Sequence, residues 1–180
     1  MRKVLYIMGQ LSDEDVEWMA HAGRRIAPEA GQTLIRQGAP VADMFILLDG
    51  SVSVQVGGVS VAHLGSGELF GEMSFVDSAP PSATVSAETG CLVLALDKRT
   101  IEARLADQPA FAGRFYKALA IFLADRLRSQ NERVSASAQG GLKRNEIMED
   151  ELDDAVLDQV SVAGLRFERM IKTLMTARAA

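Results

Sequence analysis

The pattern of apolar and polar positions is first helical, over residues 11–26. Ser12 is a suitable N-cap, and the three acidic residues that follow it suit the positive end of a helix dipole. Val16, Met19 and Ala20 then fall on one face. The pattern therefore predicts an N-terminal amphipathic helix over residues 11–26.

Between residues 32 and 97 the period changes to two, and short apolar runs alternate with glycine-containing turns. Residues 51–56 place a valine at every second position, and Gly57–Gly58 is a suitable hairpin tip before the chain returns. Many short strands at near-regular spacing are typical of a small barrel or jelly roll. The predicted strands are 33–35, 44–48, 51–56, 59–64, 69–70, 84–87 and 92–96.

The helical period returns from residue 99, and a long helix is predicted over about residues 109–134. Its apolar stripe consists of Phe111, Phe115, Leu119, Phe122 and Leu123. The segment SASAQGG, residues 135–141, is small and polar, which is typical of a flexible linker. A helical tail is predicted over residues 142–180.

This tail carries a heptad-like apolar pattern. One heptad position holds Val156, Ala163 and Met170, and the other holds Val160, Phe167 and Leu174. Such a helix either folds back on its own domain or joins a second chain, and the sequence leaves both open. Together with the long helix it predicts a homodimer, or a protein partner bound through the long helix and the C-terminal helix.

The composition narrows the class of protein. The 180 residues carry a net charge of −5, which argues against nonspecific attraction to nucleic acid or to an anionic membrane. No stretch approaches the length of a transmembrane helix, and the apolar run at the start is too short for a signal sequence. The single cysteine, Cys91, cannot form an internal disulfide. We therefore expect a cytoplasmic protein.

Residues that carry catalysis or bind metals are scarce. The only histidines are His21 and His63, which are too few for a cupin-type metal site, and no Ser–His–Asp or Cys–His set is evident. The tail after the long helix is short, includes the acid-rich NEIMEDELDD, and has no helix-turn-helix pattern or basic recognition helix. We expect no catalytic residue, metal site, cofactor or direct DNA binding.

The segments GQTLIRQGAPVADMFILLDGSVSV, GELFGEMSF and SATV, set between an N-terminal helix and a long helix, resemble the cyclic-nucleotide-binding domain family. That family includes catabolite-activator-type transcription factors, kinase regulatory subunits and cyclic-nucleotide-gated channels. The resemblance covers residues 11 to about 130. It implies an α+β fold within residues 1–134: an eight-stranded, antiparallel, jelly-roll-like β-roll over about 31–97, flanked by the two helices. The C-terminal helical tail is additional.

The resemblance also implies a site for cyclic AMP or cyclic GMP. Glu72 would accept a hydrogen bond from the ribose 2′-hydroxyl, and Ser82 and Ala83 would donate to the cyclic phosphate. The N–H groups at Gly71 would point towards the cyclic phosphate or the ribose. Alternatively, Glu72 simply caps the short helix that follows it. The implied ligand-binding residues are Phe70, Gly71, Glu72, Met73, Ser74, Pro81, Ser82, Ala83, Thr84 and Arg126.

One position departs from the family pattern. The family's phosphate-pairing arginine immediately precedes the small-residue pair, and here that position is Pro81. Residues 37–97 contain no lysine or arginine at all, although acidic residues are frequent there. A charge-assisted hydrogen bond is worth about 1.5–3 kcal/mol, so its loss costs roughly one to two decades of affinity. Replacement cations would have to come from Arg114, Lys117, Arg126 or Arg128 on the long helix, or from its copy in a dimer.

These observations together predict a noncatalytic regulatory or sensor module that binds cyclic nucleotide weakly or not at all. One alternative is a functional cyclic AMP or cyclic GMP signalling protein that uses a cation from the long helix. The other is a degenerate domain that acts through protein–protein contacts.

Overall fold

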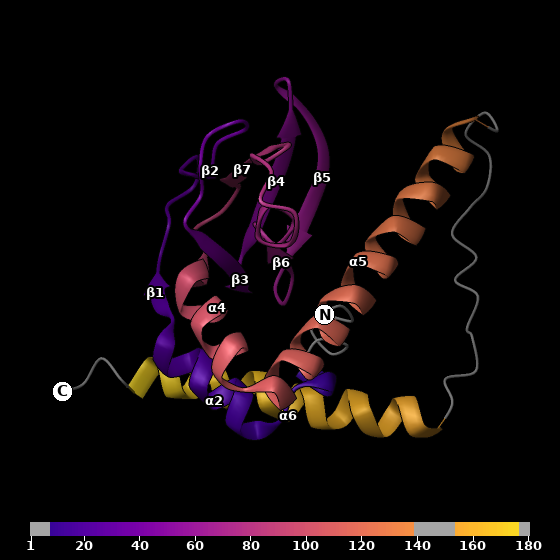
Figure 1. The fold of residues 1–180 in the computed structure, drawn as a ribbon. Coiled ribbons are helices and arrows are strands. Elements are labelled where there is room, and N and C mark those ends of the chain that lie inside the picture. Colours follow the sequence, from indigo (N-terminus) through magenta and orange to yellow (C-terminus); the bar gives the residue numbers. More distant parts are fainter. Residues whose placement is uncertain (1–7, 139–153, 177–180) are drawn as a thin grey trace.

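The structure is a computed structural model that describes residues 8–138 and 154–176, with side chains described over 8–131 and 162–174. A β-roll of two four-stranded sheets stands above a group of helices, and a long helix runs up past one side of the roll (Figure 1). The strands are β1 Arg24–Ile26, β2 Thr33–Ile35, β3 Asp43–Asp49, β4 Ser51–Val56, β5 Val59–Gly65, β6 Leu69–Phe70, β7 Thr84–Ala87 and β8 Leu92–Asp97. The helices are α2 Asp13–Ala22, α3 Met73–Val76, α4 Lys98–Asp107, α5 Pro109–Ala138 and α6 Asp154–Thr176.

The strand orders are β1-β8-β3-β6 in one sheet and β2-β7-β4-β5 in the other, and every pairing is antiparallel. Alternate residues of the strands point between the sheets, where Phe45 of β3 stacks on Phe70 of β6 with ring centroids 5.0 Å apart. Fully buried Val52 and Val93 fill the same core. The predicted eight-stranded antiparallel β-roll is confirmed.

The roll begins earlier in the chain than the sequence predicted. The N-terminal helix ends at Ala22 rather than at residue 26, and Arg24–Ile26 instead form β1, paired with β8. Gly23 makes this change of direction possible, because a Cβ there would lie 2.4 Å from a methyl carbon of Leu94. The start of the helix is as predicted, with Ser12 and Asp15 forming a capping box.

The helices share a second apolar core with the outer face of the first sheet. The predicted stripe of α5 faces this core: Phe111, Phe115, Leu119 and Phe122 are all buried. Helix α5 continues to Ala138, four residues beyond its predicted end, so the first part of the predicted linker is helical. Residues 139–141 of that linker lie outside the described residues.

Helix α6 folds back on its own domain and packs along α2 (Figure 1). Ala163, Met170 and Leu174 of the predicted heptad pattern are buried in the helical core, and Phe167 packs against it. The side chains of the other two heptad residues, at 156 and 160, lie outside the described part. Arg166 fixes the arrangement by donating to Asp13 Oδ1 at 2.6 Å and to the Met8 carbonyl at 3.0 Å.

A buried ion pair joins the first helix to the long helix. Asp15, 1% exposed, accepts two hydrogen bonds from Arg114 at 2.6 and 3.0 Å. Burial opposes ionisation of Asp15, but the bonds from Arg114 and Ser12 prevail and lower its pKa below the usual 3.8. Among the described helices, none is long and apolar enough to cross a membrane.

Candidate functional site

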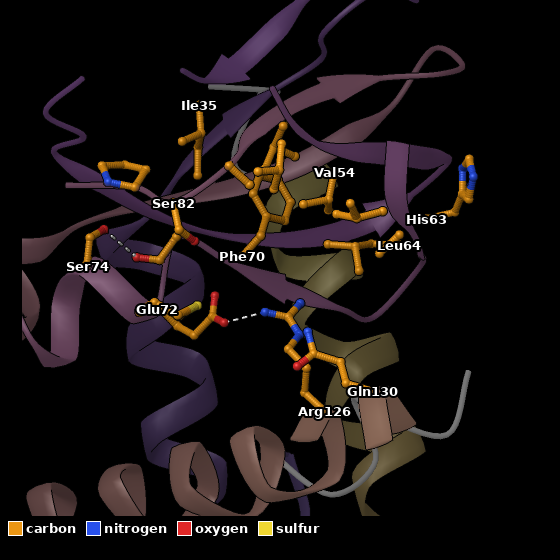
Figure 2. Close-up of a pocket in the computed structure, with 18 of the residues that line it drawn as sticks. Ile35, Val54, His63, Leu64, Phe70, Glu72, Ser74, Ser82, Arg126 and Gln130 are labelled. Atoms are coloured by element: carbon orange, nitrogen blue, oxygen red, sulfur yellow. Dashed lines mark hydrogen bonds and ion pairs between the residues drawn. The ribbon is translucent and has the colours of Figure 1, made fainter. Parts of the chain in front are cut away.

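A cavity of about 450 Å³ opens between the β4–β5 hairpin, the segment 70–74, the segment 81–83 and helix α5 (Figure 2). Nine of the ten sequence-predicted ligand residues line it: Phe70, Gly71, Glu72, Met73, Ser74, Pro81, Ser82, Ala83 and Arg126. Thr84 is the exception, since it lies in β7 and its Oγ1 accepts a hydrogen bond from the Gln37 amide at 3.0 Å. The fold therefore brings together residues that are more than fifty positions apart in the sequence.

The segment from Phe70 to Ser74 is shaped by a left-handed residue. Gly71 has a φ of +83°, and a Cβ there would lie 3.1 Å from the Asp43 carbonyl and 3.2 Å from a methyl carbon of Ile35. A side chain at this position would be strained and crowded at once. The turn at Gly71 directs the chain from β6 into the short helix α3, and it places Glu72 at the cavity wall.

Glu72 does not cap α3, which contradicts the capping interpretation of this residue. Its side chain makes no cap hydrogen bond and is instead paired with the guanidinium of Arg126 on α5 (Figure 2). Glu72 is 1% exposed, whereas the Arg126 side chain is 22% exposed. Arg126 also donates to the Leu69 carbonyl at 3.2 Å and lies over the Phe122 ring at 4.8 Å.

Burial is the largest influence on the Glu72 carboxyl, and it raises the pKa above the usual 4.5. The positive charges of Arg126 and Lys98 act in the opposite direction. A buried carboxyl with its cation is thus held at the cavity wall, where a ligand hydroxyl could compete with Arg126 for the carboxylate oxygens.

Arg126 is the single lysine or arginine among the described residues that line the cavity. The other three long-helix candidates lie elsewhere. Arg114 is committed to Asp15, and both Lys117 and Arg128 are exposed and away from the cavity wall. Among the described lining residues, the cation thus comes from α5 and not from the β-roll.

Sequence reasoning missed one cation close to the site. Lys98, the first residue of α4, donates from Nζ to the Ser74 hydroxyl at 2.7 Å, and Ser74 in turn donates to the Gly71 carbonyl at 3.3 Å. Burial lowers the pKa of the Lys98 ammonium below its usual 10.5, although nearby acidic groups, Asp43 first, oppose the shift. The signal lay in the strand register: Asp43 pairs with Asp97, so the chain after β8 emerges beside the Gly71 turn.

The rest of the cavity wall is mostly apolar. Val54, Val61 and Leu64 of the hairpin line the cavity, as do Ser129 and Gln130 of α5. His63 lies at the edge of the cavity (Figure 2). Its Nδ1 lies 2.6 Å from Glu88 Oε1. In the described part of the chain, no three His, Cys, Asp or Glu side chains are grouped so as to hold a metal ion. The cavity thus offers an apolar half and a polar half, the latter formed by Glu72, Ser74 and Ser82.

Comparison with known proteins identifies the family to which the β-roll and its Gly71–Glu72 turn correspond. Residues 26–108 match the family described as cyclic nucleotide-binding domain. This part of the chain belongs to the cyclic nucleotide-binding domain family. The domain's two sheets and its Gly71–Glu72 turn are the elements that the sequence had indicated.

Among curated relatives, glutaminase 2 of Bradyrhizobium diazoefficiens is 42% identical over 108 residues, which are 58% of this chain and 17% of the relative. A cyclic nucleotide-gated potassium channel of Mesorhizobium japonicum is 38% identical over 88 residues, 49% of this chain and 24% of the channel. The cAMP-dependent protein kinase regulatory subunit of Yarrowia lipolytica is 29% identical over 102 residues, 57% of this chain and 27% of the subunit. The chain therefore spans only a small part of the length of these relatives.

Solved structures give the same fold. A cyclic nucleotide-binding domain of Methylobacillus flagellatus superposes with a TM-score of 0.69 at 23% identity, covering 81% of this chain and 85% of that one. The Thermus thermophilus catabolite activator protein gives 0.59 at 23% identity, covering 96% and 87%. At these identities the likeness concerns the fold alone.

Proposed function

We propose that the domain is a noncatalytic regulatory module whose cavity binds a cyclic nucleotide weakly. Glu72 would accept the ribose hydroxyl, and Ser82 with Ala83 would donate to the cyclic phosphate. The observation that carries the proposal is that Glu72, Arg126 and the Ser82–Ala83 segment line one cavity. Two relatives, the cyclic nucleotide-gated channel and the cAMP-dependent kinase regulatory subunit, support cyclic nucleotides as the ligand class.

Two features of the cavity make the binding weak. The phosphate would meet Pro81, which has no side-chain donor, at the position where the family resemblance implies an arginine. The ribose would have to share Glu72 with Arg126, which already holds the carboxylate. Each lost charge-assisted hydrogen bond costs about 1.5–3 kcal/mol, so the dissociation constant is expected well above the micromolar range.

The same ion pair suggests how occupancy would be transmitted. A ligand hydroxyl at Glu72 would weaken the contact that ties α5 to the roll, because Arg126 reaches Glu72 and Leu69 from that helix. Helix α5 would then shift relative to the β-roll. A partner chain in contact with α5 would respond to this change in the helix position, and ligand binding would thereby be transmitted to the partner.

One observation favours the alternative in which the long helix supplies the missing cation. Arg126 already lies in the cavity, so it could leave Glu72 and pair with the phosphate instead. In that case cyclic nucleotides would bind tightly, and Arg126→Ala would abolish binding. Tight wild-type binding that resists this substitution would contradict both versions.

Self-association through α5 is also part of the proposal. Tyr116, Ala120, Leu123 and Leu127 follow one another at spacings of four, three and four, which is the coiled-coil pattern. Tyr116 and Leu127 are 51% and 59% exposed, whereas Leu123 also packs against the helical core, so this stripe borders the buried one and leaves its outer positions uncovered. Three turns of matching apolar positions favour a second copy of the same helix as the partner.

The experiment that tests the ligand proposal adds the missing cation. Pro81→Arg should tighten the binding of cyclic AMP or cyclic GMP roughly tenfold to a hundredfold, measured by isothermal titration calorimetry. Ala79→Arg is the matched control, because it adds the same charge to the same exposed segment and Ala79 does not line the cavity. A folded Pro81→Arg variant that still binds no cyclic nucleotide would refute the ligand site and leave the protein-contact alternative.

A further inference from the structure

The contact between Lys98 and Ser74 places a second positive charge behind the polar half of the cavity. Lys98 does not line the cavity itself, but its Nζ lies 2.7 Å from the Ser74 hydroxyl oxygen, which does. Figure 2 shows Ser74 and Ser82 at the end of the cavity away from Arg126. The ammonium and the guanidinium therefore act on opposite ends of the site.

The direction of this hydrogen bond controls what the Ser74 hydroxyl can offer. A lysine ammonium has only donors, so it occupies a lone pair of Ser74 Oγ and leaves the hydroxyl hydrogen to be donated elsewhere. That hydrogen now goes to the Gly71 carbonyl at 3.3 Å, a long contact. A ligand oxygen at the cavity wall could take it over, and donation from a cation strengthens the hydroxyl as a donor.

The surroundings keep Lys98 in this position. It is half-buried at the start of α4, and Asp43, Glu102, Glu72 and Asp77 all attract its charge. Its neighbour Arg99 carries the same charge but points away, with a side chain that is 90% exposed and lies 3.9 Å from Asp97. Two adjacent cations thus differ in whether they reach the site.

We propose that Lys98, acting through the Ser74 hydroxyl, is a positioning residue that selects an anionic or acceptor-rich group at the Ser82 end of the cavity. This inference rests on the proposed function and names the group that replaces the missing arginine. Because a point charge that works through a hydroxyl grips less firmly than a bidentate guanidinium, the binding stays weak. The cavity nevertheless still prefers an anionic ligand to a neutral analogue.

The test compares a charged ligand with its neutral counterpart. Cyclic AMP, a monoanion, and adenosine, which has no phosphate, are titrated into the full chain and followed by amide chemical shifts in NMR spectra. Lys98→Met should weaken the binding of cyclic AMP about fivefold to thirtyfold and change that of adenosine by less than about twofold. Ser74→Ala should give the same split, Lys98→Arg should restore part of the affinity, and the control Arg99→Met should change neither ligand.

Three results would overturn the inference. Unchanged cyclic AMP affinity in both Lys98→Met and Ser74→Ala would show that the pair does not act on the ligand. Equal losses for cyclic AMP and adenosine would show that Lys98 merely holds α3 in place. Failure of the wild-type chain to bind either ligand would remove the proposed function as well, so that outcome is recognised from the wild type alone.

Discussion

The substitution Arg126→Met isolates the ion pair on which the proposed signalling depends. It removes the guanidinium that pairs with Glu72, a carboxyl that is 1% exposed, while keeping an apolar stem beside Phe122. Removing one partner of a fully buried pair costs about 3–5 kcal/mol. Arg126 is 22% exposed and water can enter the cavity, so a smaller loss of unfolding free energy, about 1–3 kcal/mol, is expected at neutral pH.

The pH dependence of this loss follows from the raised pKa of Glu72. Burial lifts the folded-state pKa of Glu72 above the unfolded value of 4.5, so the folded protein favours the neutral carboxyl more than the unfolded chain does. The contribution of this raised pKa to the free energy of unfolding is fully present below pH 4.5. It is lost as the pH rises through the folded-state pKa. Arg126→Met raises that pKa further, because the opposing charge is gone. The variant should therefore lie closest to wild type near pH 5 and furthest from it near pH 8.

Urea unfolding followed by circular dichroism measures these differences, and a double-mutant cycle with Glu72→Gln isolates the pair. The double variant should be more stable than Arg126→Met alone, because no carboxyl is left buried without a cation. The reasoning would be refuted if Arg126→Met changed the unfolding free energy by less than about 0.5 kcal/mol at every pH. It would also be refuted if the loss were greater at pH 5 than at pH 8.

Two further predictions concern the helices. In sedimentation equilibrium at micromolar concentration the wild-type chain should be a dimer and Leu127→Glu a monomer, since a charge at this exposed position would face its copy; a monomeric wild type would contradict the self-association proposal. Met170→Ala should lower the unfolding free energy by about 2–4 kcal/mol, because Met170 is 1% exposed in the helical core. The control Leu165→Ala, at a position 64% exposed, should lower it by less than about 0.5 kcal/mol. Similar losses in the two variants would show that α6 does not pack on the domain as described.

The sequence predicted the β-roll well because its signals are local. Valines at every second position of β4 and the Gly57–Gly58 turn are sufficient to define a hairpin, and the turn at Gly71 marks the end of β6. The end of α2 was placed four residues too late, because Gly23 acts through a close approach to Leu94 that no local pattern reveals. The boundary of an element cannot be predicted from the local pattern where it depends on a contact between residues that are distant in the sequence.

The residues of the site, too, could be predicted only where a local motif identifies them. Its residues near Glu72 and Ser82 could be found from motifs, but the partner of Glu72 lies 54 positions away on α5. Lys98 was not predicted because it lies one residue beyond the end of β8, and no local pattern places the start of α4 beside the Gly71 turn. The heptad pattern of α6 likewise suited two outcomes, and it is the packing of α6 along α2, with Ala163, Met170 and Leu174 buried, that shows the helix folding back within the described chain.

We propose that this cavity is a cyclic nucleotide site weakened by the absence of one cation and by the pairing of Glu72 with Arg126. The wild-type arm of the calorimetric titration, with cyclic AMP and cyclic GMP at high protein concentration, tests it most directly. We predict saturable binding of at least one of the two nucleotides, with a dissociation constant well above the micromolar range. A submicromolar dissociation constant, or no heat of binding at millimolar nucleotide, would contradict the account.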